Sequence, residues 1–311
     1  MVAFLFPGQG SQYPGMIQDL YKDFAVVRRA VEEASDVLKM DAAHFLFAST
    51  AEELTRTDKS QLAIYLSSMA IFRALAECIP ELQPVVCAGL SLGEYTALTA
   101  SGKMSFAEGL LLVKARGEYM QEACLARKGF MAAVLGLDCS AVACALQEVC
   151  DVWVANINCP GQVVIAGDVL SMEKAVCVLK EKGAKKLIPL DVAGAFHTQF
   201  MKSAQEKLRL PLETLHLQET KVDIVMNAVG DFVTDLSAIR DLLIAQVVSP
   251  VLWQAGILAM ESHGILLYVE VGCGKTLSGM NRKIGVQGKT LSIGSTADIV
   301  QLEEEYAAFK K

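Results

Sequence analysis

The chain has 311 residues, which is beyond the length at which a single hydrophobic core usually stops growing, so we expect two domains or a domain with an insertion. Hydrophobic residues make up 53% of it, a share typical of a parallel sheet that is buried on both faces and whose strands are continuous apolar runs. The formal net charge of −7 at pH 7 argues against a nucleic-acid-binding protein, because binding to phosphates requires a clustered basic surface.

The apolar runs are too short or too interrupted to predict a membrane protein. The strongest candidate, 62–76, contains Arg73 and two serines and falls short of the roughly 20 apolar residues that a span requires. At the N-terminus, 2–6 has no basic residues before it and is followed at once by Pro7 and Gly8, so we expect a strand and not a signal peptide. We therefore expect a protein that does not contact a membrane.

The nine cysteines are scattered along the chain, and no two of them form a C-x-x-C pair. With only four histidines present, this spacing argues against a zinc site. The odd number of cysteines and the lack of an export signal indicate reduced thiols, so we expect a cytoplasmic protein that holds no metal.

Strands and helices alternate through the first part of the chain. The apolar patterns predict, in order, a strand at 2–6, helices at 24–39 and 59–78, a strand at 84–88, and helices that end at Ala100 and cover 106–123. A glycine-containing turn follows each of the two strands, at 7–11 and 89–93. This βαβ-like order predicts a parallel sheet with helices on its faces.

The order of elements changes between residues 126 and 192. The patterns there predict a βαββαβ unit, with strand, helix, strand, strand, helix and strand at 130–135, 140–148, 152–156, 162–166, 170–182 and 185–190. The α/β pattern then resumes, with strands near 224–228, 266–271 and 290–293 and a charged helix at the end. We therefore expect an α/β fold in which 1–125 and 193–311 form an α/β-hydrolase-like parallel-sheet core and 126–192 form an inserted ferredoxin-like subdomain.

A G-x-S-x-G motif lies between a predicted strand and a predicted helix, as Gly89-Leu90-Ser91-Leu92-Gly93. In this setting the serine is typical of a nucleophile on a sharp turn, and the glycines let the strand and the helix approach closely. The N-terminus of the following helix supplies N–H groups that stabilise an oxyanion. The alternative is a glycine-bounded turn whose serine only caps the helix.

A serine nucleophile needs a base, and histidine is the usual one. His44 and His216 lie in polar, helix-like surroundings, and His263 precedes a glycine at the end of a predicted helix. His197 directly follows the last strand of the inserted unit, where the chain returns to the main one, so it can lie in a cleft between the two. The alternative for His197 is a surface histidine near a helix start.

Taken together, these motifs resemble the family of bacterial malonyl-CoA:acyl-carrier-protein transacylases and the related acyltransferase domains of polyketide and fatty-acid synthases. The resemblance covers nearly the whole chain, and its most specific segments are F-P-G-Q-G-S-Q at 6–12, G-L-S-L-G-E-Y at 89–95 and G-A-F-H at 194–197. Further matching segments occur in the same order, at 116–117, 120–121, 156–167, 246, 250–251 and 270–275.

The resemblance implies a malonyltransferase of fatty-acid biosynthesis that works by a ping-pong mechanism through a malonyl-serine ester. In this family the serine at Ser91 is the nucleophile and the histidine at His197 is the general base and acid. A main-chain carbonyl at the position of Gln246 orients the histidine in place of a carboxylate. The oxyanion hole is formed by the N–H groups at the positions of Gln9 and Leu92.

Three further positions are implied to bind the substrate. Arg116 pairs with the free carboxylate of the malonyl group, Phe196 accompanies a preference for malonyl over branched acyl groups, and Asn156 lies along the approach of the pantetheine arm. The family needs no metal or redox cofactor, since malonyl-CoA and phosphopantetheinylated acyl carrier protein are its substrates. We therefore expect a monomer whose protein partner is a transiently bound carrier protein.

The chain departs from the family pattern at two positions. Leu90 stands where the family usually has a histidine immediately before the nucleophile, and Leu62 stands where proline commonly follows Gln61. The residue before the nucleophile shapes the acyl pocket but does not transfer the proton in this scheme, so we expect activity to survive; we interpret the departure at Leu62 as structural.

Two alternative functions remain open from the residues. One is a serine thioesterase or esterase on the same fold, which would pass the acyl group to water, although a cation at Arg116 has no use in a generic esterase. The other is a catalytically inactive acyl-binding protein, against which the presence of Ser91, His197 and Gln9 argues.

Overall fold

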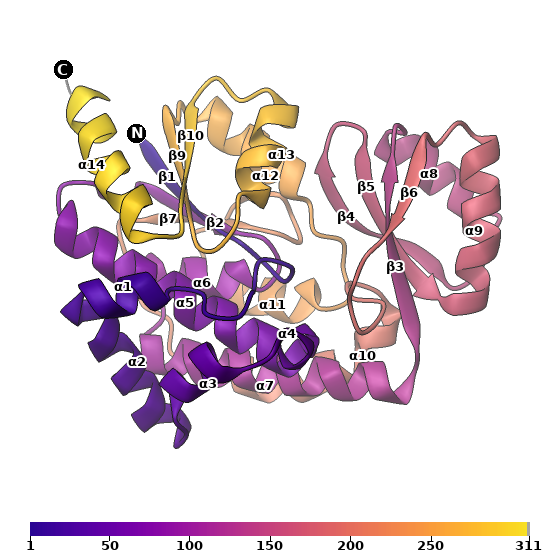
Figure 1. The fold of residues 1–311 in the computed structure, drawn as a ribbon. Coiled ribbons are helices and arrows are strands. Elements are labelled where there is room, and N and C mark those ends of the chain that lie inside the picture. The colour runs from indigo at the N-terminus through magenta and orange to yellow at the C-terminus, as the bar shows by residue number, and fades with distance from the viewer. Residues whose placement is uncertain (310–311) are drawn as a thin grey trace.

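The computed structural model describes residues 1–309, which form two β-sheets that lie side by side, with helices packed around them (Figure 1). The larger sheet, sheet A, has the strand order β10-β9-β1-β2-β7-β8. Its strands are parallel except for β8, which pairs antiparallel with β7. They are β1 (Val2–Phe6), β2 (Val86–Gly89), β7 (Asp223–Met226), β8 (Asp231–Phe232), β9 (Leu267–Val271) and β10 (Lys289–Ile293).

Alternate side chains of sheet A enter two different apolar cores because successive residues of a strand point to opposite faces. Phe4 and Phe6 of β1 belong to the larger core, whereas Ala3 and Leu5 belong to a second core on the other face. The second core is closed by α12 (Trp253–Ser262) and α13 (Thr276–Ile284). On the first face and around it lie α1 (Gln18–Asp23), α2 (Ala25–Leu38), α3 (Ala42–Ala48), α4 (Ala51–Thr55), α5 (Thr57–Cys78), α6 (Gly93–Ala100), α7 (Phe106–Ala126), the 3-10 helix η1 (Gln199–Met201), α10 (Lys202–Glu213), α11 (Leu236–Gln246) and α14 (Thr296–Phe309).

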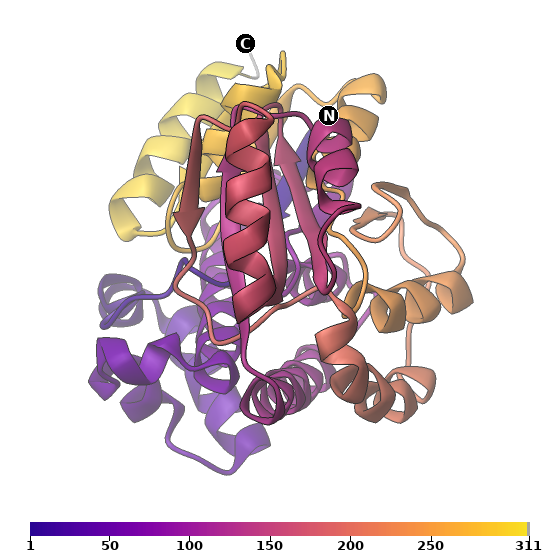
Figure 2. The same ribbon diagram turned by 90° about the vertical axis from the view of Figure 1, so that its right-hand side faces the viewer.

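The smaller sheet, sheet B, has the order β4-β5-β3-β6, and every neighbouring pair in it is antiparallel. Its two helices lie on the outer side of the molecule, and α9 lies in front of the strands in Figure 2. The inner face carries Met131 and Ala133, which join the large core. The elements are β3 (Gly129–Leu135), α8 (Cys139–Leu146), β4 (Val152–Cys159), β5 (Gln162–Asp168), α9 (Val169–Glu181) and β6 (Lys186–Pro189).

The observed topology confirms the α/β fold class, with a mainly parallel sheet and a separate βαββαβ unit. The largest error among the predicted strands is at β4, which runs three residues beyond the predicted 156. Irregular pairing at Asn156 and again near Cys159 interrupts the strand pattern there. The division into 1–125 with 193–311 and 126–192 stays a prediction, and all strands of sheet B lie between residues 129 and 189.

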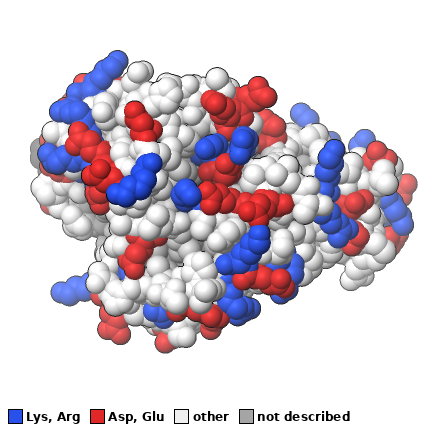
Figure 3. Space-filling view, turned by 90° about the horizontal axis from the view of Figure 1, so that it is seen from below, with Lys and Arg blue, Asp and Glu red and all other residues white. Residues whose placement is uncertain are grey.

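The surface carries both signs of charge. On the face shown in Figure 3, basic and acidic side chains are interspersed. None of the nine cysteines forms a disulfide. Within residues 1–309, no helix combines the length and the apolar character that crossing a membrane requires.

Candidate active site

Ser91 lies on the turn between β2 and α6 with a φ of 53°, in the left-handed region that non-glycine residues seldom occupy. This conformation costs about 1–3 kcal/mol and persists only where the surroundings impose it. The flanking glycines are required by packing. A Cβ at Gly89 would collide with the backbone of Gly93, and a Cβ at Gly93 would collide with the Phe6 carbonyl. The turn therefore holds the serine clear of the strand.

The Ser91 side chain contacts a buried histidine. Ser91 Oγ lies 2.8 Å from His197 Nε2, and His197 Nδ1 lies 2.9 Å from the main-chain oxygen of Gln246. The pKa of His197 is lowered from 6.5 to about 4, mainly by burial and to a smaller extent by the Arg116 cation, while the hydrogen bond to the Gln246 carbonyl acts in the opposite direction. At pH 7 the imidazole is neutral. Because Nδ1–H donates to the carbonyl, Nε2 is free to accept the serine proton.

The other three histidines lie elsewhere. All three are exposed, and none contacts Ser91. His44 lies on α3 and His263 at the C-terminal end of α12. His216 follows α10 outside any helix, so the expectation of helix-like surroundings was wrong for this residue.

A cavity of about 230 Å³ opens in front of the serine, between the two sheets. Gln9 and Leu92 line it, and their backbone N–H groups donate no hydrogen bond to another group within residues 1–309. They are therefore available to a ligand. All three predicted substrate-binding residues line the cavity, and so does Leu90, which differs from the usual histidine of the family. Besides Ser91, His197, Gln9 and Leu92, the lining residues are Gly8, Leu90, Arg116, Met120, Met131, Ala133, Asn156, Asn158, Gln162, Val164, Leu190, Val192, Phe196, Thr276 and Met280.

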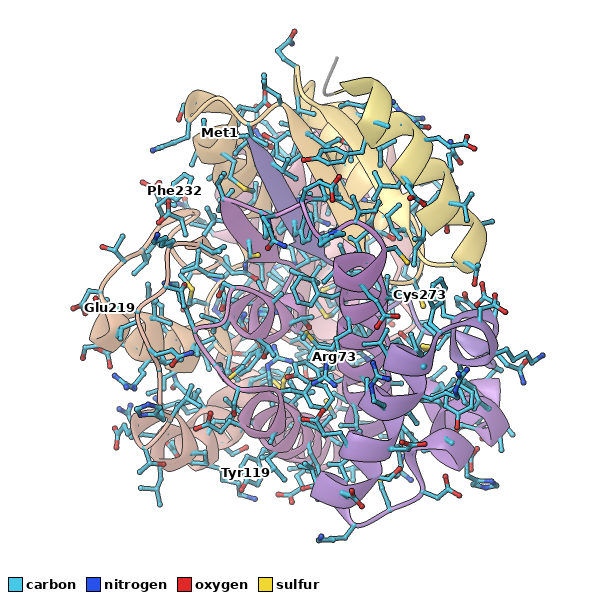
Figure 4. The ribbon with its side chains drawn as sticks, turned by 90° about the vertical axis from the view of Figure 1, so that its left-hand side faces the viewer. Met1, Arg73, Tyr119, Glu219, Phe232 and Cys273 are labelled. Atoms are coloured by element: carbon cyan, nitrogen blue, oxygen red, sulfur yellow. The ribbon has the colours of Figure 1, made fainter. Side chains whose placement is uncertain are left out.

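Arg116 projects from α7 to the serine and is only 1% exposed. Its Nη2 donates to Ser91 Oγ and to Gln246 Oε1, each at 3.0 Å, and its Nη1 donates to Gln61 Oε1 at 2.5 Å. Among the described residues, no carboxylate forms an ion pair with it. Arg73, labelled in Figure 4, differs in this respect, since its Nη1 lies 2.6 Å from Glu33. Burying an unpaired cation is costly.

A buried polar network beneath the serine was not predicted from the sequence. Glu94 is fully buried and accepts hydrogen bonds from Gln246 Nε2 at 2.7 Å and from the Asn227 N–H at 2.5 Å. Burial raises the pKa of Glu94 to about 8, and these two donors and Arg116 act in the opposite direction. Glu94 falls inside the recognised G-L-S-L-G-E-Y segment, which could have drawn attention to it. No sequence pattern marked Asn227, because it follows β7 and is 136 positions away from Ser91 in the chain.

The site contains no cluster of metal ligands. Within the described residues, no three His, Cys, Asp or Glu side chains converge as they would around a metal ion. The polar side chains around the cavity are amides, the hydroxyls of Ser91 and Thr276, one imidazole and one guanidinium. This set can transfer a proton, stabilise an oxyanion and bind a carboxylate.

Comparisons with known proteins agree with this geometry. A family model described as an acyl transferase domain matches residues 3–285. The malonyl CoA-acyl carrier protein transacylase of Bacillus subtilis is 39% identical over 302 residues, covering 96% of this chain and 95% of the relative. The crystal structure of the corresponding enzyme from Streptococcus pneumoniae has a TM-score of 0.92 at 39% identity and covers 98% and 100% of the two chains. A malonyl-transacylase solved in complex with a type II polyketide synthase acyl-carrier protein has a TM-score of 0.92 at 35% identity and covers 98% and 99%.

Proposed function

Because the chain belongs to the acyl transferase family, we propose that it transfers a malonyl group from malonyl-CoA to the phosphopantetheine thiol of an acyl carrier protein. The chain is an acyltransferase, and its relatives named above are malonyl-CoA–acyl carrier protein transacylases. The reaction supplies malonyl groups to fatty-acid biosynthesis. It proceeds by a ping-pong mechanism through an ester on Ser91.

The observation that carries this proposal is the buried guanidinium beside the nucleophile. Arg116 Nη2 lies 3.0 Å from Ser91 Oγ, and the partners of Arg116 are neutral oxygens. A malonyl group attached to Ser91 carries its carboxylate only two carbons beyond the ester carbonyl, within reach of this cation. A guanidinium binds a carboxylate through two parallel hydrogen bonds. The site thus selects an acyl group that has an acid at its far end.

The first half-reaction acylates the enzyme. Ser91 Oγ attacks the thioester carbonyl carbon of malonyl-CoA while His197 Nε2 takes the hydroxyl proton, and the Gln246 carbonyl stabilises the imidazolium. The N–H groups of Gln9 and Leu92 stabilise the oxyanion. The carbon–sulfur bond then breaks, and His197 returns the proton to the CoA thiolate.

The second half-reaction runs the same steps in reverse order. The pantetheine arm enters along Asn156, and His197 takes the proton of its thiol. The thiolate attacks the ester carbonyl, the bond to Ser91 Oγ breaks, and His197 protonates the released serine. Atoms and charges balance in both halves with these groups, so we propose no metal or redox cofactor.

Intact mass spectrometry tests the proposal directly. Malonyl-CoA alone should add one malonyl group to the enzyme, and holo carrier protein should remove it and gain the same mass. Ser91→Ala should give no adduct. Rapid loss of the adduct to water, without added thiol, would identify a hydrolase. An adduct mapped by digestion to another residue would contradict the assignment of Ser91.

We also propose that the enzyme works as a monomer in the cytoplasm and binds its carrier protein only transiently. The nine unpaired cysteines suit a reducing compartment. Light scattering coupled to gel filtration, with and without carrier protein, measures both states. A stable dimer would contradict the first part of this proposal.

A further inference from the structure

Asn227 lies directly after β7 and is buried, with 3% of its surface exposed. Its side chain makes two hydrogen bonds to the turn that carries the nucleophile. Oδ1 accepts from the Ser91 N–H at 2.6 Å, and Nδ2 donates to the Gly89 carbonyl at 2.8 Å. The amide therefore bonds the backbone on both sides of Leu90.

This pair of bonds has the pattern of a parallel β-ladder. In such a ladder, one residue donates its N–H to the residue before its partner and accepts from the residue after it. Backbone pairing between β2 and β7 ends with Ala88 opposite Val225. After Met226 the backbone of β7 turns away towards β8. The Asn227 side chain continues the ladder beyond the point where the backbone has left it.

The backbone needs this support because Ser91 is in the left-handed region. A buried N–H without a partner is destabilising, and a strained turn relaxes where nothing holds it. Resting on the proposed role of Ser91 as nucleophile, we propose that Asn227 is a positioning residue, whose side-chain amide acts as a substitute peptide group and sets the direction of the serine side chain.

The same residue connects the serine to the support of the histidine. The Asn227 N–H donates to Glu94, which also accepts from Gln246 Nε2. Gln246 Nε2 donates in addition to the Ser91 carbonyl at 2.9 Å, and the Gln246 carbonyl faces His197. Both reacting side chains are therefore held by one continuous set of hydrogen bonds. A shift of Asn227 is expected to misalign Ser91 Oγ with His197 Nε2.

Two variants test the role of the amide. Asn227→Ala removes both bonds, and a misplacement of about 1 Å at a reacting group is enough to lower a rate about a hundredfold. We expect kcat to fall by this order while KM for malonyl-CoA changes little. Asn227→Asp is isosteric. As a carboxylate it cannot donate to the Gly89 carbonyl, but as a carboxylic acid it can donate there and still accept from Ser91.

The aspartate variant should therefore recover activity as pH falls. Its rate of malonyl transfer is divided by that of the wild type at each pH between 6 and 8, which removes the part of the pH dependence that the two proteins share. The charged or titratable groups around the position are Glu94 on α6, Arg116 on α7 and His197 after β6. Burial beside Glu94 raises the pKa of the new acid. We expect this ratio to rise at least tenfold towards pH 6, with no such rise for Asn227→Ala.

The rate at which a serine-directed fluorophosphonate labels Ser91 is measured in parallel, because it does not depend on malonyl-CoA. If wild-type enzyme is labelled but transfers no malonyl group, the proposed function fails while the test of Asn227 still stands. Asn281→Asp is the control, since Asn281 is equally buried and donates to Thr290. Its ratio to wild type should not rise at low pH. Labelling of folded Asn227→Ala at the wild-type rate, or an Asn227→Asp ratio that does not change with pH, would overturn the proposal.

Discussion

Sheet A contributes loop residues to the site, whereas sheet B contributes residues from within its strands. Gln9, Ser91 and Asn227 follow the carboxyl ends of β1, β2 and β7. Met131 and Val164 project from the middle of β3 and β5 and form the facing wall. The ends of parallel strands place turns and backbone N–H groups where they can take part in a reaction. The face of a sheet instead presents a rigid surface, against which a substrate can pack. We therefore expect changes around sheet A to alter the rate and changes facing sheet B to alter the choice of acyl group.

Arg116 is expected to be an exception to this division. It lies on a helix that covers sheet A, but it is proposed to select the acyl group. Removing one partner of a buried ion pair costs about 3–5 kcal/mol. Arg116→Ala should therefore lower kcat/KM for malonyl-CoA about a hundredfold to a few thousandfold. Acetyl-CoA has no carboxylate, so its slow reaction should be unchanged or faster. Arg116→Lys should recover part of the loss, because a lysine cannot form the two parallel bonds.

The ratio of malonyl to acetyl specificity constants measures this effect. Arg73→Ala is the matched control, since Arg73 is paired with Glu33 and does not line the cavity. It should lower stability and leave the ratio unchanged. If both substrates decline together in Arg116→Ala, the arginine supports the fold and does not bind the acyl carboxylate.

The pH dependence of labelling and of stability tests the environment of His197, which contacts Ser91 beside sheet A. With the pKa of His197 at about 4, the imidazole proposed as the base stays neutral down to that pH. At pH 5 fluorophosphonate labelling should keep most of its rate, whereas an unperturbed histidine would lose about thirtyfold. Because folding lowers this pKa, the unfolded chain binds more protons between about pH 4 and 6.5. The contribution of His197 to stability is complete above that window and is lost as pH falls through it.

Labelling rates and the free energy of unfolding, measured from pH 4 to 8, check both expectations. Variants at exposed histidines, such as His44→Gln, should give the same curves as wild type. An acid limb centred near pH 6.5 would show that solvent reaches His197.

A substitution at Phe196 tests the proposed preference for malonyl over branched acyl groups. Phe196 lies seven residues after the end of β6, the last strand of sheet B. This phenyl ring lines the cavity and is 6% exposed. An added methyl group in a filled space typically costs about 1–3 kcal/mol. Phe196→Ser should therefore raise the rate with methylmalonyl-CoA relative to malonyl-CoA by about tenfold. If the ratio of the two rates is unchanged, the selection of the acyl group would be assigned to Leu90 instead. Because Leu90 lies on the sheet A side of the cavity, this result would contradict the expected division between the two sheets.

The smallest effect is expected at the carrier-protein surface. Two exposed basic pairs are candidates, Lys185 with Lys186 at the start of β6 and Arg282 with Lys283 at the end of α13. We expect both to attract an acidic carrier protein, because complementary charge speeds association. Reversing both pairs should raise the carrier-protein KM severalfold and weaken its dependence on salt. The KM for malonyl-CoA serves as the internal control, and an unaltered carrier-protein KM would rule these pairs out.

Features of the fold and the site that depend on residues close together in the chain could be predicted from the sequence, whereas contacts between distant residues could not. The turn at Ser91 was predictable because its glycines are neighbours in the chain, and most strands were predictable because their apolar runs are local, but the two-residue β8 was missed. Helix α10 was missed, and its sequence contains Pro211, which normally ends a helix. The contact of Asn227 with Ser91 could not be predicted, because no local pattern marks a polar residue that bonds a turn 136 positions away. The roles of the individual site residues stay predictions.

The supports of Ser91 have a consequence for the order of synthesis. The serine and the histidine are both present once residue 197 has been made, but Asn227 and Gln246 come later in the chain. Gln246 is separated from Ser91 by 155 positions. A growing chain on the ribosome therefore carries its nucleophile for some time without the groups that align it. If Asn227 and Gln246 position Ser91 as proposed, a chain that ends before residue 246 lacks part of this support, and we expect it to react slowly or not at all.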